Sequence, residues 1–443
     1  MGATKSKEPA KSQRGAVDLS LLSARCDKVY INGLQRTHDD YINRAVLNLF
    51  KAETFKDLLV ETGQCKANLN ELGIFKDVHV SIDVSKGDSA TKNGYEITFK
   101  GTELSRLTGS IGTEIGNNEG AATAEITSPN IFGRGERLSV SGSYSNNRTT
   151  DFNVKLSKPF YHTRMGDYKP EVSLNLFKNT GSFPWSKYTT QDAGAMLDFS
   201  FLMPVYLSHH FQYEWAVREI GTAEKRVPFF VRKNCGPRLA SLFRHMCIYD
   251  QRDSSIFPSQ GLFIKMTNEM SGFGGNVSYT KSDTHGEINI PLFGGMSLQF
   301  CGRVGMVQEN DKSPAVPISN LFTLGGPLTV RGFQTAGVGE HIEGAAVGAH
   351  TYWASGIHLW THLPFRRHFG GFGENFRVHF FGNAGNVDSF STEGCRTSIG
   401  AGIAFRLGER ARIELNYCKP LSKAKKDAAR PEGFQFGIGY EFL

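Results

Sequence analysis

The chain has 443 residues, of which 39% are hydrophobic and 21% charged. Its net charge of +7 is modest for this length, and the Lys and Arg residues are dispersed rather than gathered in blocks, which argues against a nucleic-acid-binding surface. The seven cysteines are scattered without a CxxC pair, so the sequence predicts free thiols rather than a zinc site or a disulfide framework.

The N-terminal tail, residues 1–25, is mostly polar. It begins MGATKSKEPAKSQRG, which lacks the apolar core of a secretory signal peptide. Its first six residues fit the M-G-x-x-x-[ST] pattern for acylation of Gly2, but the pattern is short, and an unmodified N-terminus is the simpler interpretation. Nowhere does the chain contain the run of about 18 apolar residues that a transmembrane helix needs.

Residues 26–104 have the pattern of a small mixed domain. Thr37 is predicted to cap a helix whose apolar residues recur at the spacing of one helical face. These residues are Ile42, Ala45, Val46 and Leu49. A second helix is expected to begin near Phe55 and to stop at Gly73.

Three short strands complete this domain. They are expected at residues 28–31, 78–82 and 95–99, which gives the order β-α-α-β-β. An exposed edge of such a sheet, at residues 95–99 or 28–31, can accept a strand from another chain.

From about residue 105 to the end, large apolar residues repeatedly occupy every second position. Clear examples are Phe152, Val154 and Leu156; Val172, Leu174 and Leu176; Leu262, Ile264 and Met266; Phe376, Val378 and Phe380; and Ile413, Leu415 and Tyr417. A period of two puts alternate side chains on opposite faces of a strand. This pattern is typical of a transmembrane β-barrel, with one face toward lipid and the other toward a watery lumen, although a soluble β-sandwich gives similar single strands.

The last predicted strand runs from Phe434 to Phe442. Its small and polar residues, Gln435, Gly437, Gly439 and Glu441, alternate with large apolar ones. The first barrel strand is expected near residues 107–112, which include Gly109 and Gly112. Glycine weakens strand packing and register, so a seam between the first and last strands is predicted to be weak, unless these glycines mark only barrel curvature.

Four stretches resemble one family. The first is Val330-Arg331-Gly332-Phe333, in a long polar loop late in the predicted barrel. The second is Phe381-Gly382-Asn383-Ala384-Gly385, which is similar to an F-x-D-x-G strand motif with Asn383 in place of Asp. The others are residues 72–78, which resemble part of a polypeptide-transport-associated (POTRA) domain, and residues 128–136, which resemble the turn between the first two barrel strands. Together they are similar to the barrel-assembly insertase superfamily, and in particular to the channel subunits of the mitochondrial sorting and assembly machinery.

This resemblance implies a polar tail (1–25), one POTRA domain (26–104) and an antiparallel transmembrane barrel of about 16 strands (105–443). It implies insertion of unfolded β-barrel precursors into the mitochondrial outer membrane, by pairing client strands at the seam. The implied partners are those precursors, accessory subunits and membrane lipid, with the POTRA domain in the intermembrane space. No nucleic acid, cofactor or enzymatic reaction is implied.

The resemblance also points to individual residues. Gln435, Gly437, Tyr440 and Phe442 fit a mitochondrial sorting signal. Arg331 is expected to anchor the loop inside the lumen.

The partner of Arg331 is open, because Asn383 offers only a neutral oxygen. An acid such as Glu340, or exposure of Arg331 to water, is an alternative. His209 and His210 are expected to point to opposite faces of a strand, so no metal site is predicted there.

Two other functions remain possible from the sequence alone. A passive porin explains the alternating strands but neither the small domain nor the loop motif. The other is a related translocation pore that secretes a partner across the membrane. The chain carries none of the P-loop, HExxH or GxSxG patterns that would indicate a familiar enzyme class.

Overall fold

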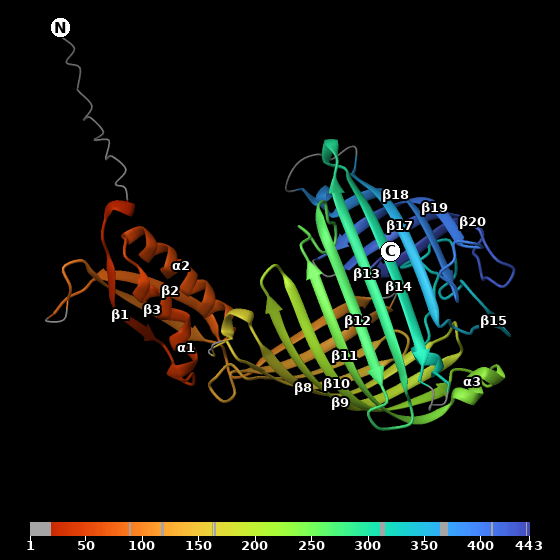
Figure 1. The fold of residues 1–443 in the computed structure, drawn as a ribbon, viewed down its shortest axis with the longest axis horizontal. Coiled ribbons are helices and arrows are strands. Elements are labelled where there is room, and N and C mark those ends of the chain that lie inside the picture. Colours follow the sequence, from red (N-terminus) through yellow and green to blue (C-terminus); the bar gives the residue numbers. More distant parts are fainter. Residues whose placement is uncertain are drawn as a thin grey trace, which may run out of the picture. The chain divides into compact units, whose positions relative to one another are not determined.

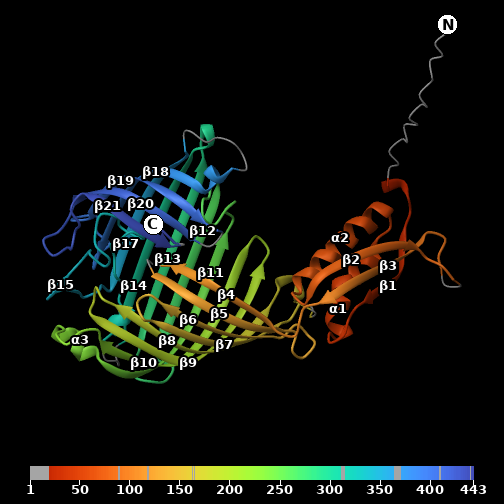
Figure 2. The ribbon, with the colours of Figure 1, turned by 180° about the vertical axis from the view of Figure 1, so that it is seen from behind.

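The computed structural model describes residues 19–87, 90–116, 119–161, 163, 165–310, 315–363, 371–408, 411–439 and 441–443. They form two compact units. The smaller contains residues 19–106 together with the turn Pro129–Gly135, and the larger contains most of the remainder. Figures 1 and 2 show the elements of both units from opposite sides.

The smaller unit packs two helices and two short 3-10 helices against a three-stranded sheet. Its elements are η1 (Leu19–Leu21), β1 (Arg25–Asn32), α1 (Asp39–Val46), η2 (Leu47–Lys51), α2 (Phe55–Glu71), β2 (Phe75–Val84) and β3 (Gly94–Glu103). Leu49, Leu58, Ile97 and Phe99 are among its fully buried core residues. The β-α-α-β-β order therefore agrees with the sequence pattern.

Strand β3 lies in the centre of this sheet, paired in parallel with β1 and antiparallel with β2. The expectation that residues 95–99 form an open edge is therefore wrong, because both sides of β3 carry hydrogen-bonded neighbours. The open edges belong to β1 and β2.

The first helix also starts later than predicted. His38, not Thr37, is the N-cap of α1. The Thr37 hydroxyl instead donates to the Glu103 carboxylate at 2.7 Å, so a tertiary contact outweighs the local capping preference. In α2 the cap is local: the Thr54 side chain accepts from the Asp57 backbone N–H.

The larger unit is a 16-stranded sheet curled into a barrel (Figure 1). The strands are β4 (Thr108–Gly116), β5 (Glu119–Pro129), β6 (Arg137–Ser145), β7 (Thr150–Pro159), β8 (Glu171–Phe183), β9 (Tyr188–Met203), β10 (Leu207–Thr222), β11 (Gly236–Asp250), β12 (Gly261–Ser271), β13 (Tyr279–Pro291), β14 (Ser297–Glu309), β17 (Thr351–His362), β18 (Phe376–Val387), β19 (Arg396–Leu407), β20 (Ala411–Ser422) and β21 (Gly433–Gly439). Every barrel pair with a described register is antiparallel. The predicted fold class is confirmed.

A helix and a short hairpin lie between the barrel strands. They are α3 (Phe229–Asn234), between β10 and β11, and the two-stranded hairpin of β15 (His341–Ile342) and β16 (Ala345–Ala346) within the long loop that follows β14. Among the described residues, four short 3-10 helices also lie in the connections: η3 (Gly166–Tyr168), η4 (Phe293–Gly295), η5 (Ile318–Asn320) and η6 (Phe372–Asn375). Within the described residues, no helix has the length and apolar character needed to cross a membrane.

Strand β20 shows how the alternation positions side chains. Leu415 and Tyr417 point outward and are exposed, whereas Arg412, Glu414 and Asn416 point inward and are buried. The same period of two places Gln435, Gly437 and Gly439 inside along β21.

The strand directions fix which ends of the barrel the connections occupy. The sheet has 16 antiparallel strands, an even number, so the start of the first strand, β4, and the end of the last, β21, lie at the same end of the barrel. The long loop between β14 and β17 leaves from the opposite end, since β14 is the eleventh strand in the sheet.

Two strand assignments need correction. The turn at residues 130–136 joins β5 to β6, the second and third barrel strands, rather than the first two. The cause is β4, a short strand of small and polar residues whose weak alternation hides the first hairpin. Strand β21 ends at Gly439, so Phe442 is not part of it, and Tyr440 lies outside the described residues.

Candidate functional site

Strands β4 and β21 are the two ends of the barrel sheet (Figure 2). Within the described part of the chain, no hydrogen-bonded register joins them. Residues 108–113 of β4 are all exposed, and Ile111 has 91% of its surface free. Among the described residues, the two end strands of the barrel are therefore not joined by a hydrogen-bonded ladder.

The glycines of the two strands meet different surroundings. A Cβ on Gly437 would lie 2.8 Å from the Pro327 side chain, and one on Gly439 would lie 2.9 Å from Leu328. A Cβ on Gly109 would meet its nearest neighbour at 3.9 Å, an ordinary contact. The absence of a side chain at Gly437 and Gly439 thus allows the long loop to pack against the inner face of β21. The sequence predicted these glycines only as signs of a weak seam or of barrel curvature.

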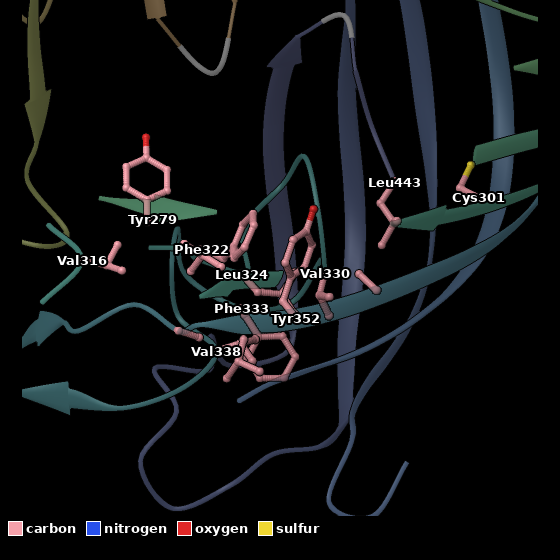
Figure 3. Packing of buried hydrophobic residues seen from close by; sticks show 14 of the residues in the cluster. Tyr279, Cys301, Val316, Phe322, Leu324, Val330, Phe333, Val338, Tyr352 and Leu443 are labelled. Carbon is pink, nitrogen blue, oxygen red and sulfur yellow. The ribbon is translucent and has the colours of Figure 1, made fainter. Parts of the chain in front are cut away.

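The loop motif lies inside the barrel. Val330 and Phe333 are fully buried in an apolar cluster that includes Tyr352 of β17 (Figure 3). Gly332 has φ +84°, a conformation that side chains rarely adopt. Its carbonyl oxygen accepts from the Arg430 N–H at 3.0 Å, which ties the loop to the segment between β20 and β21.

Arg331 is completely buried and makes three separate sets of contacts. Its Nη2 and Nε donate to Glu414 Oε2 at 2.8 and 3.2 Å. Its Nη1 donates to Asn383 Oδ1 at 3.3 Å and to the Leu443 carbonyl oxygen at 2.7 Å. The alternative of a solvent-exposed arginine is therefore wrong.

Glu340 is not the acid that Arg331 uses. Glu340 pairs instead with Lys426 at an exposed position. The acid is Glu414 on β20. Its Oε1 lies 2.8 Å from Arg412 Nε, and its Oε2, which Arg331 contacts, also accepts from the Asn416 side-chain amide. Two guanidinium groups and an amide thus surround one carboxylate, which offsets the desolvation of a fully buried charge.

The strand motif on β18 forms the wall opposite the arginine. The Phe381 ring lies 4.9 Å from the Arg331 guanidinium, within reach of a cation–π contact. A Cβ on Gly385 would come within 3.0 Å of Leu324 and Val330, so glycine is needed where the loop crosses the strand. The structure therefore brings all members of the loop motif and strand motif together.

Gln435 connects the loop to the seam. Its side-chain oxygen accepts from the Gly332 N–H, and its side-chain nitrogen donates to the Phe333 carbonyl, both at 2.9 Å. Such an amide pairs with the loop backbone as a neighbouring strand would. A residue predicted only as part of a sorting signal thus holds the loop motif.

The chain after β21 turns into the lumen. Phe442 is 4% exposed, with its ring 4.3 Å from the Arg412 guanidinium and 5.6 Å from that of Arg331. The prediction that Phe442 belongs to the outward face is wrong, because two buried cations attract its ring from inside. Leu443 is 1% exposed and belongs to the same apolar cluster as Val330.

The two adjacent histidines lie on opposite faces. His209 stacks on His245 on the same face as the exposed Tyr213, and His210 lies inside, 3.6 Å from Asp198. In the described part of the chain, no group of three or more His, Cys, Asp or Glu side chains is arranged to hold a metal ion.

Sequence and structure comparisons bear on this architecture. Residues 130–442 match the Omp85 superfamily domain. A SAM50-like protein of Drosophila melanogaster is 50% identical over 439 residues, covering 99% of both chains. The human sorting and assembly machinery component 50 homolog is 39% identical over 431 residues, covering 94% of this chain and 90% of its own.

The chain belongs to the SAM50 family of the Omp85 superfamily. The fold of BamA from Haemophilus ducreyi, solved without its POTRA domains 1–3, is similar, with a TM-score of 0.76 at 18% identity over 94% of this chain and 84% of that one. SAM50 membership confirms the predicted family and its membrane β-barrel. In this family member the acid that meets the loop arginine stands on β20, and Asn383 makes only a neutral hydrogen bond.

Proposed function

We propose that this protein inserts and assembles β-barrel precursors in the mitochondrial outer membrane. The support is the family, since relatives covering nearly the whole chain are named components of the sorting and assembly machinery. On this proposal the protein is not an enzyme, because its work is strand pairing rather than covalent chemistry.

The observation that carries the mechanism is the open edge of β4. An unpaired backbone N–H or C=O in hydrocarbon costs several kcal/mol, so an entering strand needs a hydrogen-bonding partner. The exposed strand β4 offers such an edge beside β21, with no ladder between the two in the described residues. A client strand adds to β4, and the next pairs with the first, so no edge meets lipid unpaired.

Arg331 has a supporting role in this mechanism. Through Glu414 it fixes the loop to β20, and Gln435 then fixes the loop to β21. The loop therefore supports one side of the seam from inside the lumen, so that opening takes place at β4.

The POTRA domain lies in the intermembrane space on this proposal. Its chain joins β4 directly, at the end of the barrel where β21 also ends. Precursors reach the membrane from that compartment, and the open edge of β1 or β2 can hold their strands before insertion. Accessory subunits of the assembly complex and membrane lipid complete the set of partners.

Site-specific crosslinking tests the proposal. A single cysteine at Ile111 of β4 is expected to crosslink to a client precursor during assembly. A cysteine at Val217, an outward and exposed residue of β10, is the matched control. Equal crosslinking at both positions, or none at Ile111, would contradict assembly at this seam.

A passive porin is the second candidate, and the lumen argues against it. The loop motif is buried inside the barrel, and the segment between β11 and β12 reaches Arg412 of β20, where the Ile256 carbonyl oxygen accepts from Arg412 Nη1 at 3.2 Å. Reconstituted protein is expected to accelerate the folding of a client barrel and to show little steady conductance. A porin would conduct and leave client folding unchanged.

A further inference from the structure

The connection between β10 and β11, residues 223–235, contains the short helix α3. Strand β10 is the seventh in the sheet, so this connection lies at the end of the barrel opposite the start of β4. Figure 1 shows α3 at the periphery of the barrel. The helix therefore lies at one boundary of the membrane-spanning wall, close to strands that face lipid.

One face of α3 attaches it to the barrel. Val231 is fully buried, and together with Val227 it packs in an apolar cluster with three residues from other elements. These residues are Tyr188 of β9, Ile220 of β10 and Ile318 of the long loop. Because Ile220 belongs to the inward set of β10, the buried face of α3 is directed toward the lumen side of the wall.

The opposite face of α3 has no packing partner of this kind. Phe229 lies two residues before Val231, about 200° around the helix, and 70% of its surface is exposed. Arg232 and Lys233 follow Phe229 at the spacing that puts side chains on one helical face, and both are exposed. The Arg232 guanidinium lies 5.9 Å from the Phe229 ring. An aromatic ring thus stands free beside two cations.

The whole connection is positively charged. Its one acid, Glu224, lies 3.9 Å from Lys187 of the neighbouring turn. Its cations are all exposed, and among the described residues none of them forms an ion pair. They are Lys225, Arg226, Arg232 and Lys233. Four cations against one acid leave residues 223–235 with a net charge of +3, without a counter-charge from the barrel.

The strands beside this connection fix its depth in the membrane. Val217 of β10 is outward and exposed, and it pairs with Leu239 of β11. The next outward pair contains the charged Glu219, and the ladder ends at Ile220. From Val217 to Ile220 the strand advances about 10 Å, or about 8 Å along the membrane normal once its tilt is included. The headgroup layer is about 5–8 Å deep on each side of a bilayer, so residues 223–235 begin at its level.

We propose that α3 and the cations beside it form a contact site for anionic phospholipids. Phe229 enters the boundary between headgroups and acyl chains, and the four cations contact the headgroup phosphates. Clusters of four or more Lys or Arg next to a membrane-spanning element are typical of anionic lipid binding, and an aromatic residue on the same face is typical of interfacial helices. A zwitterionic surface would bury Phe229 equally well but would leave the four cations without a counter-charge.

Fluorescence quenching on the full-length protein in nanodiscs tests the contact. Phe229→Trp adds a reporter to the four native tryptophans, whose signal is measured on the unsubstituted protein and subtracted. Brominated phosphatidylglycerol is expected to quench the added tryptophan more than brominated phosphatidylcholine at the same content, and added salt should reduce the difference. No quenching by either lipid would overturn the membrane contact, and equal quenching would overturn the preference for anionic headgroups.

Charge neutralisation identifies the residues. In Phe229→Trp, the further changes Arg232→Gln and Lys233→Gln should lower the preference for phosphatidylglycerol roughly fivefold for each cation removed, as the attraction of one Lys or Arg to an anionic surface predicts. The matched control is Lys423→Gln with Lys425→Gln, which removes the same charge from exposed lysines of the β20–β21 connection, at the same end of the barrel. An equal loss in the control would mean that overall charge attracts the lipid, and it would overturn the site at α3.

A photoreactive phenylalanine analogue in place of Phe229 distinguishes a lipid from a protein partner. In isolated mitochondria it is expected to crosslink to phospholipid. A crosslink to a protein would assign this face to a protein partner and would overturn the proposal. The contact does not involve strand pairing at the seam, so its failure would leave the proposed function unaffected.

Discussion

The two strands that meet at the seam are built in opposite ways. Strand β21 is fixed on its inner face by the long loop, on one edge by β20, and at its end by the segment that enters the lumen. Among the described residues, strand β4 has a single hydrogen-bonded neighbour, β5, and its side chains at residues 108–113 are exposed. One side of the seam is anchored and the other is free.

This asymmetry explains why the loop motif and the last strand share a site. A seam that opens on both sides would leave two loose edges in lipid, each with unsatisfied backbone groups. On the proposed mechanism, anchoring β21 through Arg331 and Gln435 confines the opening to β4. Substitutions on either side of the seam test this asymmetry, from the largest expected effect to the smallest.

Arg331→Ala should have the largest effect. It removes every bond of the buried guanidinium but leaves Glu414 with Arg412, so the cost should lie below the about 3–5 kcal/mol of a buried charge left with no partner. We expect a barrel that stays in the membrane, with a protease-sensitive loop and slower precursor assembly. Limited proteolysis and an assembly time course measure these; wild-type rates would contradict the anchoring role.

Glu414→Gln should weaken the same anchor, and Asn383→Asp should rescue it. The glutamine removes the charge that Arg331 and Arg412 share, whereas the new aspartate would place a charge 3.3 Å from Arg331 Nη1. We expect the double variant to recover loop protection and assembly beyond the single variant. Glu340→Gln, at an exposed ion pair, is the control and should behave as wild type.

Much of this site was within reach of the sequence. The period of two predicted the barrel, and the motif at residues 330–333 predicted that Arg331 anchors the loop in the lumen. In β20, Ile413, Leu415 and Tyr417 face outward, so Arg412, Glu414 and Asn416 had to face inward. The same alternation places Glu414 in the lumen, but the acid named from the sequence as a partner for Arg331 was Glu340.

The sequence alone could not pair Glu414 with Arg331. The two residues are 83 positions apart, and the path of the loop decides which acid it reaches. The same limit applies to Phe442: its alternation fits an outward position, but two guanidinium groups inside the barrel determine where the ring lies.

Gly437→Ala should disturb the anchored strand more than Gly109→Ala disturbs the free one. The added methyl on β21 would press into Pro327 at 2.8 Å, whereas on β4 the nearest atom is 3.9 Å away. Overpacking of this kind costs about 1–3 kcal/mol. Thermal unfolding in detergent should show a lower midpoint for Gly437→Ala alone; equal shifts would mean that the loop does not constrain β21.

The smallest effect concerns the POTRA domain, through Glu103 at the end of β3. Burial tends to raise the pKa of the Glu103 carboxyl, but the Thr37 hydroxyl and the backbone N–H groups of Gln35, Arg36 and Thr37 outweigh it and hold that pKa at about 2, below its ordinary 4.5. A carboxylate with a lowered pKa stabilises the fold above its unfolded pKa and loses that contribution as the pH falls.

The POTRA domain should therefore lose stability as the pH falls from about 4.5 toward 2. Across this range, hydrogen exchange of the β1 and β3 amides in the wild type, divided by the intrinsic exchange rate of an unfolded chain at each pH, should quicken. In Glu103→Gln it should be faster at neutral pH and change less on acidification, because the titrating group is gone. Glu96→Gln, at an ion pair 3.6 Å from Lys28, provides the comparison and should keep the wild-type pH dependence. If Glu103→Gln retains the full pH dependence, then Glu103 does not hold residues 35–37 against the sheet.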